Sequence, residues 1–244
     1  MKSGERYNTP KLTNSLGWAY HELCHFARAI EYNHLALDSI QEILGPGTSD
    51  LFEIESQTRI NLGENYLMTG DVQKARENLK LVYENINNPA YAFARTRWKP
   101  RCLLGLGELW LQTGDADKAE SLLSELFEHQ WTDKFPYKKY QVRAWCLRSD
   151  ILSARGLMKN AEIELTRALT QANQLGNPTL LWKIQQAVGN LLLKQGKNKD
   201  AKAQFQTALK VVQDIAEGLT DVALKEGYLQ SDPIQELFSQ AQGA

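Results

Sequence analysis

The sequence predicts an all-α protein: an α-α superhelix in which about five helical hairpins stack as a right-handed solenoid, followed by C-terminal capping helices. Two observations predict this class. A short pattern of Leu-Gly, a large residue three positions later, Gly-Asp and a spaced apolar stripe recurs five times, with its marker alanine returning every 40–46 residues. Residues that favour helices dominate the rest, with only seven prolines in 244 residues. Because one such unit cannot bury its own apolar face, neighbouring units must stack.

Each member of the pattern has a physical role. The two copies that share one spacing are Leu62, Gly63, Tyr66, Gly70, Asp71, Ala75, Leu79 and Val82, and Leu106, Gly107, Trp110, Gly114, Asp115, Ala119, Leu123 and Leu126. Weaker copies are centred on Gly17, Ser149 and Gly189. The glycine of Leu-Gly lets two helices approach closely, the Gly-Asp pair ends one helix and caps the next, and the later residues form one apolar stripe. The pattern therefore predicts an antiparallel helical hairpin at each copy.

Turn signals set the limits of the hairpins. The predicted single solenoid spans 1–244, with repeats at roughly 10–45, 50–87, 89–130, 137–175 and 178–217 and capping helices within 220–242. We expect second helices of about 18–20 residues, because the period exceeds the usual ~34 residues. We expect Pro100 to kink or restart its helix, and Asn177 and Thr220 to cap the helices that follow them. In the first copy Cys24 stands where glycine would fit the turn, which we expect to weaken that turn.

Charge and cysteine content exclude several classes of protein. The formal net charge is −1 and the isoelectric point about 6.4, which argues against a nucleic-acid partner, since such proteins usually carry a basic surplus. The three cysteines lie far apart without a Cys-x-x-Cys motif, so reduced thiols in the cytoplasm are favoured over a disulfide framework. The start of the chain lacks the apolar run of a signal peptide. The longest apolar stretch, 102–111, is shorter than the ~20 residues that a membrane span needs, so no membrane partner is expected.

At the residues of the repeated pattern, the chain resembles the tetratricopeptide repeat family. The family pattern W-x2-L-G-x2-Y…A-x3-F is met closely by the second and third copies and loosely by the others, over roughly residues 10–217. The long repeats, and the ending from Ile215 to Pro233, are similar to the C-terminal arrays of large bacterial signalling ATPases. The chain itself contains no Gly-x4-Gly-Lys-Ser/Thr phosphate loop. The resemblance implies stacked helical hairpins and a tendency to bind partners.

The pattern residues point between helices, so a concave binding surface must use other positions of the first helices. A row six residues before each glycine (or Ser149) is mainly basic: Lys11, Gln57, Arg101, Arg143 and Lys183. A row one residue after it is partly acidic: Trp18, Glu64, Glu108, Asp150 and Asn190. Seven residues make about two helical turns, so the rows share a face. The predicted partner-binding residues are Asn14, Trp18, Glu64, Met68, Arg101, Glu108, Gln112, Arg143, Asp150, Lys183, Gln186 and Asn190. The alternative interpretation is a solvated ladder of ion pairs between repeats.

Two further groups have both a functional and a structural interpretation. Aromatic and basic residues alternate, as on nucleic-acid surfaces, in the run Tyr91, Phe93, Arg95, Arg97, Trp98, Lys99 and Arg101. Near-neutral charge favours packed aromatics with solvated cations instead. His21, Cys24 and His25 have ligand-like spacing, but without a fourth ligand a structural role is favoured. No catalytic motif is present, so we predict no catalytic residue, metal site or cofactor.

The leading functional hypothesis is a non-catalytic protein–protein interaction module that binds a peptide segment or a partner domain in its concave groove. The alternative is a sensor or regulatory array of a multidomain signalling ATPase or transcriptional regulator that responds to a small ligand or partner. A stand-alone enzyme is a third hypothesis. A homodimer through exposed terminal hairpins is a further interpretation, because the end of an array presents an adhesive surface.

Overall fold

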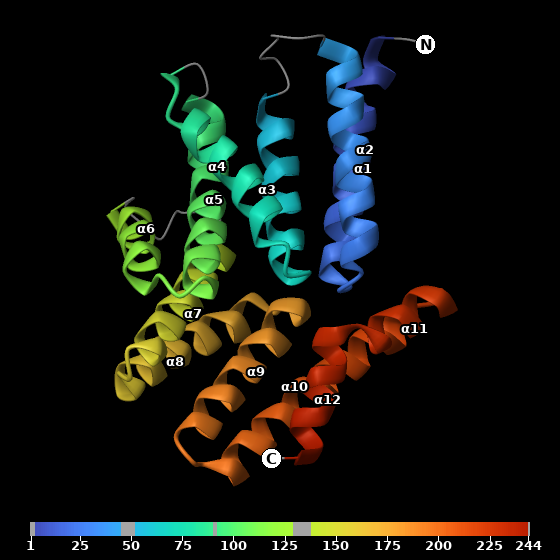
Figure 1. Ribbon diagram of the computed structural model, residues 1–244. Helices are drawn as coiled ribbons and strands as arrows, with labels where there is room; N and C mark the ends of the chain where they lie inside the picture. The colour runs from blue at the N-terminus through green and yellow to red at the C-terminus, as the bar shows by residue number, and fades with distance from the viewer. Residues whose placement is uncertain (1–2, 45–51, 90–91, 129–137, 244) are drawn as a thin grey trace. The chain divides into compact units, whose positions relative to one another are not determined.

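The computed structural model describes residues 3–44, 52–89, 92–128 and 138–243, with side chains described from residue 8 and outside 44 and 92–96 (Figure 1). Over these ranges the secondary structure is helical, with short turns and no strand. Within each of the two compact units of the chain, successive helices pack against one another, and the two helices of a hairpin run antiparallel. The predicted all-α class of stacked helical hairpins is therefore confirmed.

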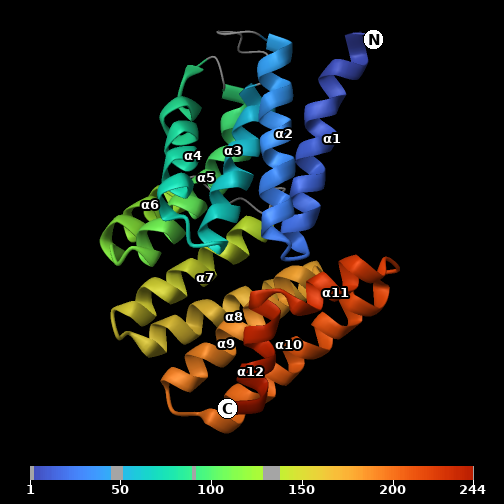
Figure 2. The same ribbon diagram turned by 45° about the vertical axis from the view of Figure 1, so that its right-hand side comes forward.

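The chain forms two compact units, 1–114 and 115–244. The helices of unit 1 are α1 (Ser3–Glu22), α2 (Phe26–Leu44), α3 (Phe52–Met68), α4 (Val72–Ile86) and α5 (Ala92–Gln112). Helix α3 packs against α1, α2, α4 and α5, and Figures 1 and 2 show these helices running side by side. The first helices α1, α3 and α5 therefore form one layer, and the second helices α2 and α4 the other.

Unit 2 continues the same construction and ends in two shorter helices. Its helices are α6 (Ala116–Glu128), α7 (Lys138–Ala154), α8 (Met158–Leu175), α9 (Pro178–Lys194), α10 (Asn198–Gly218), α11 (Val222–Gln230) and α12 (Asp232–Gly243). Helix α7 packs on α6, α8 and α9, and α10 packs on α9, α11 and α12. The terminal helix α12 buries Ile234, Leu237 and Ala241, so it covers the last hairpin of the unit.

The turns between paired helices have the expected backbone. Gly70, Gly114, Gly156 and Gly196 have positive φ angles of 74–86°, a region that glycine enters without steric penalty. Cys24 occupies the equivalent position with φ +57°. A side chain there is unfavourable, so a weakened first turn stays a prediction.

Glycine also sets how closely the paired helices approach. A Cβ atom built at Gly63 of α3 would lie 2.5 Å from Cγ of Leu79 on α4, closer than real contacts allow. Gly17 is overlain in the same way by Asn33, and Gly189 by Phe205. The glycine of Leu-Gly on the first helix and the residue four positions after the marker alanine on the second helix thus contact each other directly.

Three details differ from the expectations. Helix α4 has 15 residues rather than about 18–20, because Pro89 lies just past its end and cannot continue a helix. Helix α5 does not restart at Pro100 but runs through it, and the expected kink at Pro100 stays a prediction. The residue that caps α11 is Asp221, not Thr220, since its side chain accepts from the Leu224 backbone N–H at 2.9 Å. Asn177 caps α9 as expected.

Candidate partner-binding face

Four asparagines form a buried hydrogen-bonded group in unit 1, here called the asparagine cluster: Asn14 of α1, Asn33 of α2, and Asn61 and Asn65 of α3. Asn14 Oδ1 accepts from Asn33 Nδ2 at 3.0 Å and from Asn61 Nδ2 at 2.8 Å. Asn65 Nδ2 donates to Asn33 Oδ1 at 3.2 Å. None of the four is more than 2% exposed. The predicted site residue Asn14 is therefore an interior link between two hairpins rather than an exposed contact.

The cluster extends to a histidine at the end of α1. His21 Nδ1 lies 2.8 Å from Asn65 Oδ1. An amide oxygen can only accept, so with this amide orientation His21 must carry a proton on Nδ1. His34 of α2 makes a second such link, with its Nε2 2.8 Å from the Tyr66 hydroxyl. Burial raises the pKa of the Tyr66 phenol, so the hydroxyl stays protonated. Within the described residues, no group of three or more His, Cys, Asp or Glu side chains could hold a metal ion.

Arg101 of α5 and Glu64 of α3 form an ion pair between neighbouring first helices. Arg101 Nε donates to Glu64 Oε1 at 3.1 Å, and its Nη2 contacts Glu64 Oε2 and donates to Asn61 Oδ1 at 2.6 Å. The two side chains are only 8% and 5% exposed. The basic and acidic rows thus meet at this point as a pair between repeats, buried rather than solvated, and the pair joins the asparagine cluster through Asn61.

The remaining predicted residues of unit 1 reach the surface. Trp18 is 41% and Met68 49% exposed, Gln112 is exposed and Glu108 is half-buried. Trp18 and Glu108 each lie one residue after the pattern glycine, and Met68 and Gln112 five residues after it. These two positions are one helical turn apart on the same face. The first helices of unit 1 therefore present an apolar and polar surface above a buried polar layer.

In unit 2 the predicted residues divide in a similar way. Asp150 of α7 is exposed, while Arg143 of α7 and Lys183 of α9 are half-buried. The Lys183 ammonium lies 5.6 Å from the centre of the Trp182 ring, a weak cation–π distance. Asp150 is therefore accessible to solvent, and Arg143 and Lys183 are partly accessible.

Two predicted residues of α9 are held by the terminal helix α12. Gln186 Nε2 donates to Gln240 Oε1 at 2.9 Å, and Gln240 Nε2 donates to Asn190 Oδ1 at 3.1 Å. Gln240 lies outside the repeats, so the repeat register gave no signal that would have identified it. A partner that used Gln186 and Asn190 would compete with this helix.

The aromatic and basic run is described in part. Its members Tyr91, Phe93 and Arg95 lie outside the residues whose side chains are described. Trp98 is 5% exposed and therefore packs in the core. Arg97 is exposed and pairs with Glu53 at 2.9 Å, and Lys99 donates to Asn87 at 3.3 Å. The described part fits packed aromatics with paired cations.

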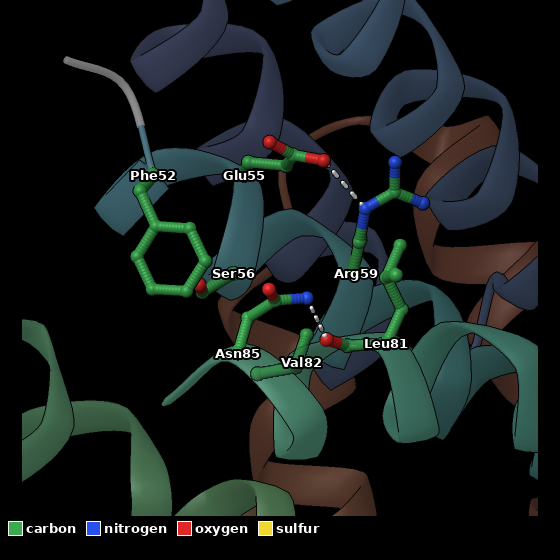
Figure 3. A pocket seen from close by; sticks show the side chains of 7 residues that line it. All are labelled: Phe52, Glu55, Ser56, Arg59, Leu81, Val82 and Asn85. Atoms are coloured by element: carbon green, nitrogen blue, oxygen red, sulfur yellow. Dashed lines mark hydrogen bonds and ion pairs between the residues drawn. The ribbon is translucent and has the colours of Figure 1, made fainter. Parts of the chain in front are cut away.

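A small pocket lies between α3 and α4 (Figure 3). Its volume is about 180 Å³, and Phe52, Glu55, Ser56, Arg59, Leu81, Val82 and Asn85 line it. The Ser56 hydroxyl is buried without a hydrogen-bond partner among the described residues, while Arg59 is held by Glu55 and Asn85 by the Leu81 carbonyl. The pocket is smaller than the ~300–1,000 Å³ of typical small-molecule sites, and its size suits one side chain.

No described helix combines the length and the apolar character that crossing a bilayer requires.

Comparisons with known proteins bear on the family. A family model described as tetratricopeptide repeat matches residues 100–125. Among solved structures, the chain is similar to a Rap protein complexed with Competence and Sporulation Factor, with a TM-score of 0.56 and 19% sequence identity over 91% of this chain. The match covers 63% of the Rap chain, so this chain spans less than two thirds of that protein. No curated protein matches the sequence. The family-model match supports a tetratricopeptide-type repeat at residues 100–125, and the structural likeness shows the same kind of helical fold.

Proposed function

We propose that the chain is a non-catalytic protein-interaction module that binds a peptide segment or a partner domain along the first helices of its hairpins. The observation that carries this proposal is the surface row of unit 1 formed by Trp18, Met68, Glu108 and Gln112, which occupy two equivalent positions on α1, α3 and α5. These exposed side chains lie on the same face of three packed helices, so one partner could contact all three. An extended or helical segment laid across these helices would meet each of them in turn.

The composition of this row suits binding. A half-exposed tryptophan supplies a large apolar contact with few rotatable bonds, and tryptophan is enriched among the residues that dominate binding energy. Methionine adapts to irregular partner surfaces. The charged and amide groups beside them offer hydrogen bonds that fix the direction of the partner.

The buried layer beneath the row supports the same proposal. Asn14, Glu64 and Arg101 act in it as rigid supports that hold the backbones of α1, α3 and α5 in a fixed arrangement. A surface that is already ordered loses little conformational entropy when a partner binds. In unit 2, Arg143, Asp150 and Lys183 are the residues proposed to contact a partner, with Gln186 and Asn190 available only where Gln240 releases them.

The comparisons add support from relatives of the fold. The tetratricopeptide repeat match spans Arg101, Glu108 and Gln112, and the similar Rap structure is a complex with another factor. A fold of this kind therefore accommodates a bound partner.

A second proposal is a regulatory array within a larger signalling ATPase or transcriptional regulator. The observation that favours it is the unbroken run of hydrogen bonds from His21 through the asparagine cluster to Arg101 and Glu64, which joins α1, α2, α3 and α5. A ligand that rotated one of these helices would have to rearrange its neighbours.

The test is quantitative affinity purification of the full chain from cells that produce it. The partner is identified as a protein that cross-links to the first helices of unit 1. We expect its recovery to fall about tenfold, a loss of ~1.4 kcal/mol in binding free energy, when Trp18→Glu and Met68→Glu are combined. The matched control is Leu157→Glu, another exposed apolar residue at 48% exposure, which should leave recovery unchanged. Equal recovery with the double variant would remove this row from the site. Hydrolysis of ATP by the purified chain would contradict the non-catalytic proposal.

A further inference from the structure

The first helix of each later hairpin packs against the preceding hairpin through three positions of the repeat. The outer face of α1 carries the same three positions. The positions concerned lie five residues before, one before and two after the pattern glycine or Ser149. They are Thr58, Leu62 and Asn65 in α3, Cys102, Leu106 and Leu109 in α5, Ala144, Arg148 and Ile151 in α7, and Ile184, Val188 and Leu191 in α9. Ten of these side chains are buried, and Arg148 and Val188 are half-buried.

Polar contacts show which element covers these positions in three of the helices. Asn65 donates to Asn33 of α2 at 3.2 Å, and Cys102 Sγ donates to the Leu79 carbonyl of α4 at 3.4 Å. The Arg148 guanidinium lies 5.3 Å from the Phe127 ring of α6. In each case the covering element is the second helix of the preceding hairpin.

Apolar packing shows the same interface at α9. Ile184 packs in one cluster with Ala168 and Ala172 of α8, and Leu191 packs in another with Ala161 and Leu165 of α8. The covering helix thus presents alanine or leucine at a first position and then four, seven and eleven residues later. This spacing is one stripe of an amphipathic helix.

In α1 the same three positions are uncovered. They hold Leu12, Leu16 and Ala19; Leu12 is 66% and Leu16 49% exposed, and Ala19 is exposed. We call these three residues the α1 stacking face. At about 100° per residue, Trp18 is separated around the helix by roughly 160° from Leu16, 120° from Leu12 and 100° from Ala19, so the α1 stacking face points in a different direction from the surface row described above. The two surfaces are therefore separate.

The other end of the repeats is treated differently. Helix α12 turns Ile234, Leu237 and Ala241 inward and exposes Gln235, Glu236 and Ser239. Polar outer faces of this kind keep terminal repeats soluble. The α1 stacking face instead exposes the apolar side chains that a neighbouring helix covers elsewhere.

We propose that the α1 stacking face binds an amphipathic α-helix of a partner protein, one that carries small and aliphatic residues at positions i, i+4, i+7 and i+11. The partner helix would lie on α1 as α8 lies on α9. This inference does not depend on the proposed function, because it uses a different face of α1.

The test uses the chain's own covering helix as the probe. A fluorescein-labelled peptide with the sequence of 158–175 is stapled between positions 159 and 163, which are exposed in α8, so that it is helical before it binds. Fluorescence anisotropy should show saturable binding to the full chain. Binding should weaken about tenfold or more, ~1.4 kcal/mol, when the chain carries Leu12→Glu and Leu16→Glu.

Two controls make the outcome decisive. A peptide with Leu165→Glu and Ala168→Glu should bind poorly, and the protein variant Leu157→Glu should bind the original peptide normally. Because Leu12 and Leu16 are exposed, the double variant should keep the helical circular dichroism of the unchanged chain. Binding weaker than about 1 mM, or equal binding by the double variant, would overturn the proposal. A dimer in sedimentation velocity that Leu12→Glu and Leu16→Glu convert to monomer would also overturn it, and would assign the face to a second copy of the chain.

Discussion

Arg101 is a buried cation that donates hydrogen bonds to two side chains of α3, Glu64 and Asn61. Burying a charge is unfavourable unless it is paired and hydrogen-bonded, and Arg101 has Glu64 and Asn61 as its partners. The planar guanidinium suits this arrangement because its donors lie in a fixed fork that matches a carboxylate. A lysine at this position could not make both contacts in the same geometry.

At the residue scale, we predict that Arg101→Met destabilises the chain by about 3–5 kcal/mol, because it removes the guanidinium that pairs with the buried Glu64 carboxylate. Urea denaturation followed by circular dichroism would measure the change. The double variant Arg101→Met with Glu64→Leu should recover most of the loss, since neither charge of this pair then remains buried. Arg97→Met is the matched control, because the Arg97–Glu53 pair is exposed and such pairs contribute about 0–1 kcal/mol. A loss at Arg97 as large as that at Arg101 would contradict the argument.

At the scale of the element, the second helices of two hairpins start at the aspartate of the Gly-Asp pair. Asp71 accepts from the Lys74 backbone N–H at 3.1 Å, and Asp115 from that of Lys118 at 3.0 Å. The same lysine side chains also bond to these carboxylates. The hydrogen bonds from the Lys74 side chain and backbone hold the pKa of Asp71 below its usual range, and Lys118 does the same for the pKa of Asp115.

These lowered pKa values set a direction for the pH dependence of stability. A carboxyl with a lowered folded pKa stabilises the fold above its unfolded pKa of about 3.9, and the contribution is lost as the pH falls through the folded pKa. We therefore predict that Asp71→Asn lowers the melting temperature at pH 6–7, and that the difference from the unchanged chain narrows below about pH 4. Thermal melts across this range would measure it. Asp115→Asn should behave alike, whereas a constant difference at all pH values would show that the charge is not involved.

The repeat pattern predicted the elements because it consists of contacts local to one hairpin. Gly63 and Leu79, or Gly70 and Asp71, lie in one unit of the sequence, so their spacing alone indicates that they meet. The candidate face was predicted only by register, since its side chains find partners in other hairpins. Whether Glu64 faces water or Arg101 depends on the distance between α3 and α5. The spacing of residues within one repeat does not predict that distance.

The sequence contains weaker indications of the buried asparagine cluster and none of the contact made by Gln240. Asn33 stands where the other hairpins carry leucine or phenylalanine, and a polar residue in an apolar stripe is a sign of a buried partner. Gln240 had no such sign, because α12 follows no repeat register.

At the scale of the whole molecule, the division into two units means that each has its own buried core. In unit 2 the last hairpin depends on α12, which packs on α10 through residues that include the fully buried Leu237. Repeat proteins gain stability from each repeat and from contacts with its neighbours. Loss of the packing of α12 should therefore lower the stability of the repeat that it covers more than that of the other repeats.

We predict that Leu237→Ala destabilises unit 2 by about 2–4 kcal/mol through the cavity that it leaves. Hydrogen exchange followed by mass spectrometry should show faster exchange in α9, α10 and α12, with a smaller change in α1–α4. The exposed Gln235→Ala is the matched control and should change exchange little. Equal acceleration through both units would show that the chain unfolds as one cooperative block.

The asparagine cluster bears on how an array of similar hairpins assembles in the right order. Apolar stripes of nearly the same shape tolerate exchange and slippage, so like repeats can stack in a wrong sequence or with the repeats of another chain. Buried amides do not tolerate such slippage, because a shift of one helical turn would leave hydrogen-bond donors and acceptors without partners in an apolar surrounding. The Asn14 side-chain oxygen accepts hydrogen bonds from both Asn33 and Asn61. This shared contact therefore makes the packing of the first two hairpins specific.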